Sequence, residues 1–194
     1  MSSGHAELPV AARVRELEER LIGAGLITDA EVDEILTEVF ASASPVNGAR
    51  MIARAWTDPA YHDRLLADGN AAAAELGFGP GSHGYLLKVV QNTASVHNVI
   101  VCTLCSCYPT ALLGPSPSWY KSFAYRSRVV REPRAVLAEF GLELPEDTEI
   151  RVWDANSETR YLVLPRRPEA ADDKDEEALM SLVSRNGLIG TAAC

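Results

Sequence analysis

The chain has 194 residues, of which 47% are hydrophobic, and this length suffices for one folded domain with extensions. Its formal net charge of −9 argues against nucleic acid or an anionic membrane as a partner. The sequence contains no uninterrupted run of about 18 apolar residues, so no membrane span is expected. The N-terminal segment lacks the apolar core of a secretory signal, so no such signal is expected. Because clustered cysteines suit a reducing compartment, we expect a cytoplasmic protein.

The first third of the chain, residues 1–76, is expected to be helical. Apolar residues recur there at helical spacing in several stretches. Thr28 and Glu31 form a capping box that starts one of these helices. The pair Asp58-Pro59 marks the start of another. We interpret this region as a helical N-terminal extension.

The pattern changes after the glycine-rich loop at 77–84. Short runs of β-branched and apolar residues predict strands at 85–91, 98–101, 149–154 and 159–164. We expect the last two strands to form a hairpin, and a helix with a break at Pro133 to lie over 119–139. The order of elements predicts an α+β fold, in which the helical extension precedes a layered α-β-β-α domain over 77–194.

Three of the four cysteines lie within six consecutive residues. Cys102 and Cys105 stand three apart, so one turn of chain can aim both sulfurs at one centre, and Cys107 closes a claw around it. In so tight a claw, the backbone nitrogens of Ser106 and Cys107 lie inside the same coordination sphere. Thiolates favour soft or strongly bound metals. Three sulfurs and two amide nitrogens leave an octahedral ion one open position for substrate or water.

Other thiol sites fit the spacing less well. A structural zinc site needs four ligands, and His97 is a conceivable fourth. A redox pair of Cys102 and Cys105 is weakened by the third cysteine and by the missing βαβ pattern. An iron–sulfur cluster needs a fourth cysteine, for which only Cys194 is left.

The run SVHNVIVCTLCSCYPTALLGPSPSWYKSFAY (95–125) resembles the metal-binding segment of the nitrile hydratase alpha subunit and of the related thiocyanate hydrolase gamma subunit. The similarity continues through YRSRVVREPRAVLAEFG (125–141), IRVWDANSETRYLVLPRRP (150–168) and LVSRNGLIG (182–190). The resemblance implies an enzyme that hydrates a nitrile to the corresponding amide. The alternatives are a thiocyanate hydrolase gamma-type subunit, or a non-catalytic metal carrier or structural zinc protein.

The same resemblance implies the roles of the claw residues. Cys102, Cys105 and Cys107 would supply sulfur, and Ser106 and Cys107 would supply amide nitrogens. In the family the second and third cysteines are oxidised, so Cys105 would be a sulfinate and Cys107 a sulfenate. Thr103 stands where cobalt-type members carry threonine and iron-type members serine. We therefore expect one cobalt(III) ion per chain, with iron(III) or zinc as alternatives, and catalysis by Cys107 beside Cys105 and Ser106.

Partner chains are also implied by the resemblance. In the family, the helical N-terminal part reaches over a beta subunit, which supplies two arginines to the oxidised sulfurs. Residues 1–76 are therefore expected to contact such a partner, and 77–194 to form the metal-binding catalytic domain. The beta-type partner could be split into two chains, and an activator or metallochaperone could load the metal. No nucleic acid or membrane partner is expected.

Thr103 is, by the same resemblance, a candidate for supporting the claw, and further residues are candidates for supporting it or for shaping the substrate pocket. Gln91 ends a predicted strand one hairpin from the claw, where the family keeps a polar residue. Tyr120 and Tyr125 could position the claw through phenolic hydrogen bonds, although packing alone would also explain them. Arg126 is expected to be a surface or interface charge. Thr110 replaces a tryptophan that is usual in the family, which predicts a wider pocket for a bulky heteroaromatic or nucleoside-like nitrile such as toyocamycin.

Overall fold

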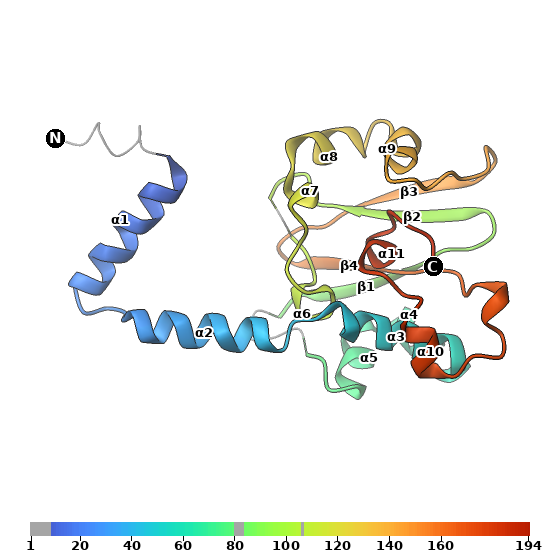
Figure 1. The fold of residues 1–194 in the computed structure, drawn as a ribbon, viewed down its shortest axis with the longest axis horizontal. Coiled ribbons are helices and arrows are strands. Elements are labelled where there is room, and N and C mark those ends of the chain that lie inside the picture. Colours follow the sequence, from blue (N-terminus) through green and yellow to red (C-terminus); the bar gives the residue numbers. More distant parts are fainter. Residues whose placement is uncertain (1–8, 80–83, 106) are drawn as a thin grey trace. The chain divides into compact units, whose positions relative to one another are not determined.

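A computed structural model describes residues 9–79, 84–105 and 107–194. The chain divides into two compact units, Met1–Ala41 and Ser42–Cys194. The first unit contains the helices α1 (Val10–Gly23) and α2 (Asp29–Ala41). The second contains α3 (Pro45–Thr57), α4 (Pro59–Ala67), α5 (Gly69–Glu75), β1 (Leu86–Gln91), β2 (Val96–Val101), α6 (Thr110–Leu113), α7 (Ser118–Lys121), α8 (Phe123–Arg128), α9 (Pro133–Glu139), β3 (Glu149–Asp154), β4 (Thr159–Leu164), η2 (Glu169–Ala171), α10 (Glu176–Met180) and α11 (Arg185–Ile189) (Figure 1).

The predicted capping box is present at the start of α2. The Thr28 amide donates to Glu31 Oε2 at 2.8 Å, and the Glu31 amide donates to Thr28 Oγ1 at 3.2 Å. These two bonds satisfy amides that a helix start leaves without partners. None of the described helices is long and apolar enough to cross a membrane.

Helices α3 and α4 begin at polar caps followed by proline. Ser44 accepts a bond from the Val46 amide, and Asp58 accepts bonds from the amides of Ala60 and Tyr61. These helices lie in the second unit, whereas the boundary predicted from sequence falls between residues 76 and 77. The physical reason is burial, because α3 packs Met51 and Ile52, both 0% exposed, into the same core as the strands.

The strands form two parallel pairs, β1 with β4 and β2 with β3. The predicted hairpin of 149–154 and 159–164 is therefore wrong, as is the hairpin that was to connect Gln91 to the claw. A short connection alone does not decide pairing, because the chain can also cross from one sheet to the next. Here the Ala155 amide donates to Val101 O at 2.7 Å, which holds the connection after β3 against the end of β2.

Figure 1 shows the layers of the second unit, with α8 and α9 above β2 and β3, and with β1, β4 and then α3 to α5 below. This order confirms the predicted α-β-β-α layering. The strands supply the centre of the core, where Val99, Ile100, Leu162 and Val163 are at most 1% exposed. The β1–β2 turn and the segment after β2 lie at opposite ends of the sheets (Figure 1).

The close approach of Gly190 to strand β2 can be tested by substitution. Gly190 has φ +91°, and a Cβ there would lie 2.0 Å from Asn98 O. Gly77 has a similar φ of +81°, but a Cβ there would meet nothing within 4 Å. We expect Gly77→Ala to lower the free energy of unfolding by about 1–2 kcal/mol, the cost of a left-handed backbone. Gly190→Ala adds the overpacking penalty and should cost about 2–5 kcal/mol.

Chemical denaturation of the two variants beside the parent chain checks this expectation. Equal destabilisation by both substitutions would show that the close approach of Gly190 to β2 does not contribute.

Candidate metal centre

The cysteine segment begins where β2 ends. Because β2 and β3 are parallel and Val101 is in register with Asp154, the carboxyl ends of both strands meet at one edge. Ligand sites of parallel sheets commonly form at such an edge. The register therefore brings Cys102 and the following residues beside the end of β3.

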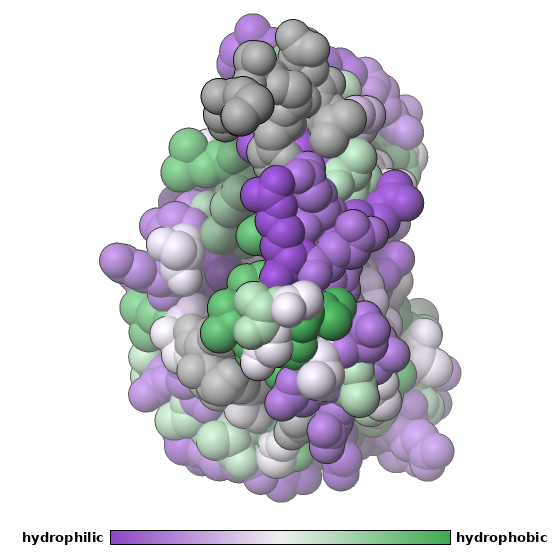
Figure 2. Space-filling model, turned by 90° about the vertical axis from the view of Figure 1, so that its left-hand side faces the viewer, coloured by the Kyte–Doolittle hydropathy of each residue, from purple (hydrophilic) through white to green (hydrophobic). Residues whose placement is uncertain are grey.

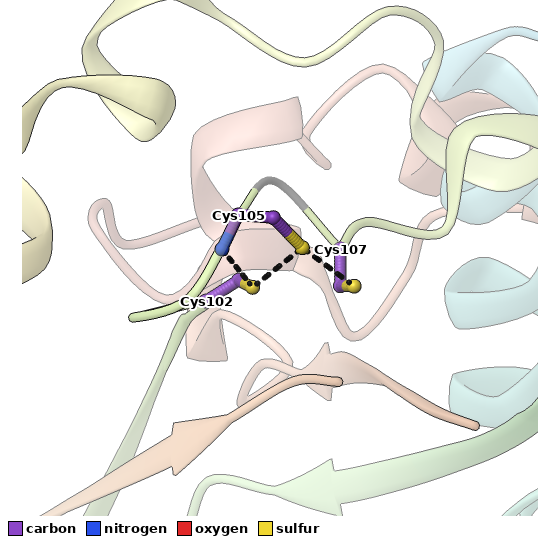
Figure 3. Close-up of side chains that lie close together, drawn as sticks. All are labelled: Cys102, Cys105 and Cys107. Carbon is purple, nitrogen blue, oxygen red and sulfur yellow. Dashed lines mark hydrogen bonds between the residues drawn. The ribbon is translucent and has the colours of Figure 1, made fainter. Parts of the chain in front are cut away.

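The three thiols of 102–107 converge as the spacing predicts (Figure 3). The sulfur of Cys105 lies 3.6 Å from that of Cys102 and 3.2 Å from that of Cys107. All three sulfurs lie within 4.8 Å of one another, and the Cys105 amide donates to Cys102 Sγ at 3.3 Å. Ser106, the other predicted amide ligand, lies outside the described residues. The donor set fits a thiophilic transition metal.

Burial differs among the three cysteines. Cys102 and Cys107 are buried, whereas Cys105 is exposed. Burial, together with the neighbouring Cys105 and Cys102, raises the pKa of the Cys107 thiol to about 11, while the positive charge of Arg160 acts in the opposite direction. Because metal ligands must be deprotonated, a bound cation has to displace this proton.

Asp154 anchors the claw from the neighbouring strand. Its carboxylate accepts hydrogen bonds from the Thr103 amide at 2.9 Å and from Thr103 Oγ1 at 2.5 Å. Thr103 was predicted as a support of the claw from the resemblance, and these bonds give its hydroxyl a partner. Asp154 was not predicted to contact the claw, because the sequence indicated it only as the end of the strand 149–154. The missing information was the pairing of β2 with β3.

Three further side chains hold the backbone of the claw through its carbonyl groups. Tyr120 Oη donates to Cys107 O at 3.0 Å, and Tyr125 Oη donates to Ile100 O at 2.6 Å. Both tyrosines are buried, so they pack and position at once, and burial raises the pKa of each phenol. Arg126, expected as a surface charge, donates from Nη1 to Cys105 O at 3.2 Å.

Other predicted residues lie farther from the sulfurs. Gln91 ends β1, and the turn that follows it lies at the opposite end of the sheets from the segment after β2 (Figure 1). Its side-chain amide lies 3.0 Å from His62 Nε2. A supporting role for Gln91 stays a prediction. His97 donates from Nε2 to Gly190 O at 2.7 Å and does not belong to the metal-ligating group found among the described residues. Thr110 is half-buried at the start of α6, three residues after Cys107.

The comparison with known proteins agrees with this geometry. The family model described as nitrile hydratase, alpha chain, matches residues 8–192. The chain belongs to this family. The cobalt-containing nitrile hydratase alpha subunit of Pseudonocardia thermophila is 49% identical over 182 residues, or 93% of this chain and 89% of that protein.

One of the relatives is named as a subunit of a different enzyme. The thiocyanate hydrolase gamma subunit of Thiobacillus thioparus is 43% identical over 189 residues, or 92% of this chain and 76% of that protein. Among solved structures, a double mutant of the Fe-type nitrile hydratase from Comamonas testosteroni matches with a TM-score of 0.88 at 41% identity. The match covers 96% of this chain and 92% of that one. Both the resemblance and the mixed helix-and-sheet fold are thereby confirmed.

The hydrogen bond from Tyr120 can be tested separately from packing. Tyr120→Phe leaves the buried Cys107 carbonyl without its phenolic donor, and we expect it to lower the free energy of unfolding by about 1–3 kcal/mol. Tyr161→Phe is the matched control, because no hydrogen bond joins its hydroxyl to another described residue. Denaturation of both variants checks the expectation. A loss of equal size in the control would show that the bond to Cys107 O makes no specific contribution.

Proposed function

We propose that this chain is the metal-binding alpha subunit of a cobalt nitrile hydratase, active with a beta-type subunit. The observation that carries the proposal is the convergence of three thiols within 4.8 Å in a chain of this family. The relative from Pseudonocardia thermophila is described as cobalt-containing, which supports cobalt as the metal. The expected reaction adds water across a nitrile and leaves its carbon–nitrogen bond intact.

The residues of the claw fit one cobalt(III) ion. Cys102, Cys105 and Cys107 would hold it through sulfur, and Cys107 and Ser106 through backbone nitrogen. When bound, the ion supplies a Lewis acid at the position where the nitrile would be polarised. Three cysteine sulfurs within 4.8 Å of one another, with no fourth side-chain ligand grouped with them among the described residues, suit such an ion better than a tetrahedral zinc site. The structural zinc alternative loses support because His97, its conceivable fourth ligand, donates to Gly190 O instead.

The chain's own groups then determine where reaction takes place. An oxidised Cys107 would offer a sulfenate oxygen that attacks the nitrile carbon or activates a water molecule to do so. Tyr120 and Asp154 hold the backbone of the claw at Cys107 and at Thr103. The exposed side of Cys105 leaves access for substrate and for hydrogen-bond donors from a partner. Anionic sulfur oxygens need such donors when a partner buries them.

The first helix supports the dependence on a partner. Within α1, Val10, Val14 and Leu17 recur on one face and are 71%, 57% and 56% exposed, and no residue of the helix is buried. Figure 2 shows hydrophobic groups exposed among hydrophilic ones on the face it draws. An amphipathic helix gains stability by covering its apolar face. We assign this face to the beta-type subunit, in one chain or two; an activator that loads the metal remains part of the proposal.

A related activity is favoured by one finding. The thiocyanate hydrolase gamma subunit of Thiobacillus thioparus shares 43% identity with this chain. The same claw would then act on thiocyanate. Assays of the assembled enzyme with nitriles and with thiocyanate, at equal metal content, distinguish the two substrate classes.

A mass measurement tests the metal and the oxidised cysteines together. Native mass spectrometry of the chain from cobalt-fed cells, with and without co-expressed partner, should show one cobalt and three added oxygens. Peptide mapping should place the oxygens on Cys105 and Cys107. Cys105→Ala removes a proposed ligand and should lose the cobalt increment together with the oxygens on that residue. A zinc increment without oxygens would overturn the proposal.

The substrate class is tested at Thr110. The small hydroxyl-bearing side chain is proposed to leave room for a bulky heteroaromatic or nucleoside-like nitrile, such as toyocamycin. Thr110→Trp should lower kcat/KM for such nitriles at least about tenfold relative to acetonitrile, a difference of about 1.4 kcal/mol. Thr110→Ser keeps the hydroxyl on a small side chain and serves as the control. Full activity of the tryptophan variant on large nitriles would contradict a role of Thr110 in specificity.

A further inference from the structure

A second strand edge carries a cavity away from the cysteines. Strands β1 and β4 are parallel, with Gln91 in register with Leu164, so their carboxyl ends also meet. They end at the opposite side of the sheets from the claw (Figure 1). A cavity of about 410 Å³ opens there between the segments that follow the two strands and the helices α3 and α4. Its volume lies in the range of small-molecule sites.

Positive charge gathers on one side of this cavity. Arg166 and Arg167 both line it, and no Asp or Glu does so. Arg167 is held by the carbonyl oxygens of Trp56 at 3.1 Å, Ala171 at 2.7 Å and Asp172 at 3.1 Å. Its Nε is buried without a hydrogen-bond partner and forms a long ion pair, at 4.0 Å, with the exposed carboxylate of Asp172. Arg166 is exposed, and no hydrogen bond or ion pair joins it to another described residue.

The other residues that line the cavity include a planar indole and neutral polar side chains. The Trp56 indole is fixed by a bond from Nε1 to Pro165 O at 3.0 Å. The end of β1 and the turn after it also line the cavity. There the Gln91 side-chain amide lies 3.0 Å from His62 Nε2, and Thr93 adds a hydroxyl. Two guanidinium groups favour a carboxylate. An ordered indole favours a flat apolar body beside it.

We propose that this cavity is a second ligand site, which binds a small aromatic carboxylate. The carboxylate pairs with Arg166 and with the charge of Arg167, and the ring lies along Trp56. Amide and hydroxyl groups of Gln91 and Thr93 complete the polar contacts. The site is separate from the claw, because the length of the six-residue strand β2 lies between them and they are at opposite ends of the sheets (Figure 1).

Calorimetric titration of the metal-loaded enzyme with its partner chains tests the proposal. Benzoate is the probe, and benzamide is its neutral counterpart of equal shape. We expect benzoate to bind and benzamide to bind at least about tenfold more weakly. Arg166→Gln should weaken benzoate binding about tenfold, and Gln91→Ala should weaken it to a smaller extent. Arg131→Gln removes an exposed arginine elsewhere and should leave the affinity unchanged.

The active site needs its own control, because benzoate could also reach the metal. The inhibition constant of benzoate for nitrile hydration should not change in Arg166→Gln. Equal affinity for benzoate and benzamide, unchanged benzoate affinity in Arg166→Gln, or no binding at all would each overturn the second site. Since binding is read by heat, an enzyme inactive on nitriles would refute the proposed function and leave this test intact.

Discussion

The candidate site depends on the parallel pairing of β2 with β3. That pairing aligns Val101 with Asp154, and every described contact that anchors Thr103 or the start of the claw follows from this alignment. A shift of one residue would turn alternate side chains to the other face of the sheet. It would also move the Asp154 carboxylate away from the Thr103 amide. The buried side chains of β2, including Val99 and Ile100, make such a shift costly because they would lose their core positions.

The supporting contacts reach the backbone of the claw, and this distinguishes their role from that of the ligands. Tyr120 and Arg126 donate to the carbonyl oxygens of Cys107 and Cys105, and Asp154 receives the Thr103 amide. Hydrogen bonds to these groups fix the turn while leaving the sulfur atoms available to a metal. Because these bonds use backbone groups and the Thr103 side chain, they do not compete with a metal for the sulfur atoms.

Local signals in the sequence predicted much of the structure, whereas the pairing of the strands was not predicted correctly. The capping box at Thr28 and the Asp58-Pro59 helix start were correct because both act within one turn of chain. The cysteine claw was found for the same reason, since its ligands lie within six residues. The hairpin of 149–154 with 159–164 was wrong because alternation gives the faces of a strand but not its neighbour. Asp154 and Arg126 were missed as claw contacts because tertiary packing alone brings them there.

The unequal burial of the three cysteines bears on how the centre matures. Cys105 faces solvent while Cys107 lies beneath the surface of the same turn. An oxidant that diffuses in from solution therefore meets the Cys105 sulfur first and reaches the Cys107 sulfur by a more hindered path. Steric access alone would carry Cys105 one step further along the oxidation series than its neighbour. For the oxidised claw that we propose, this difference in access favours the higher oxidation level at Cys105.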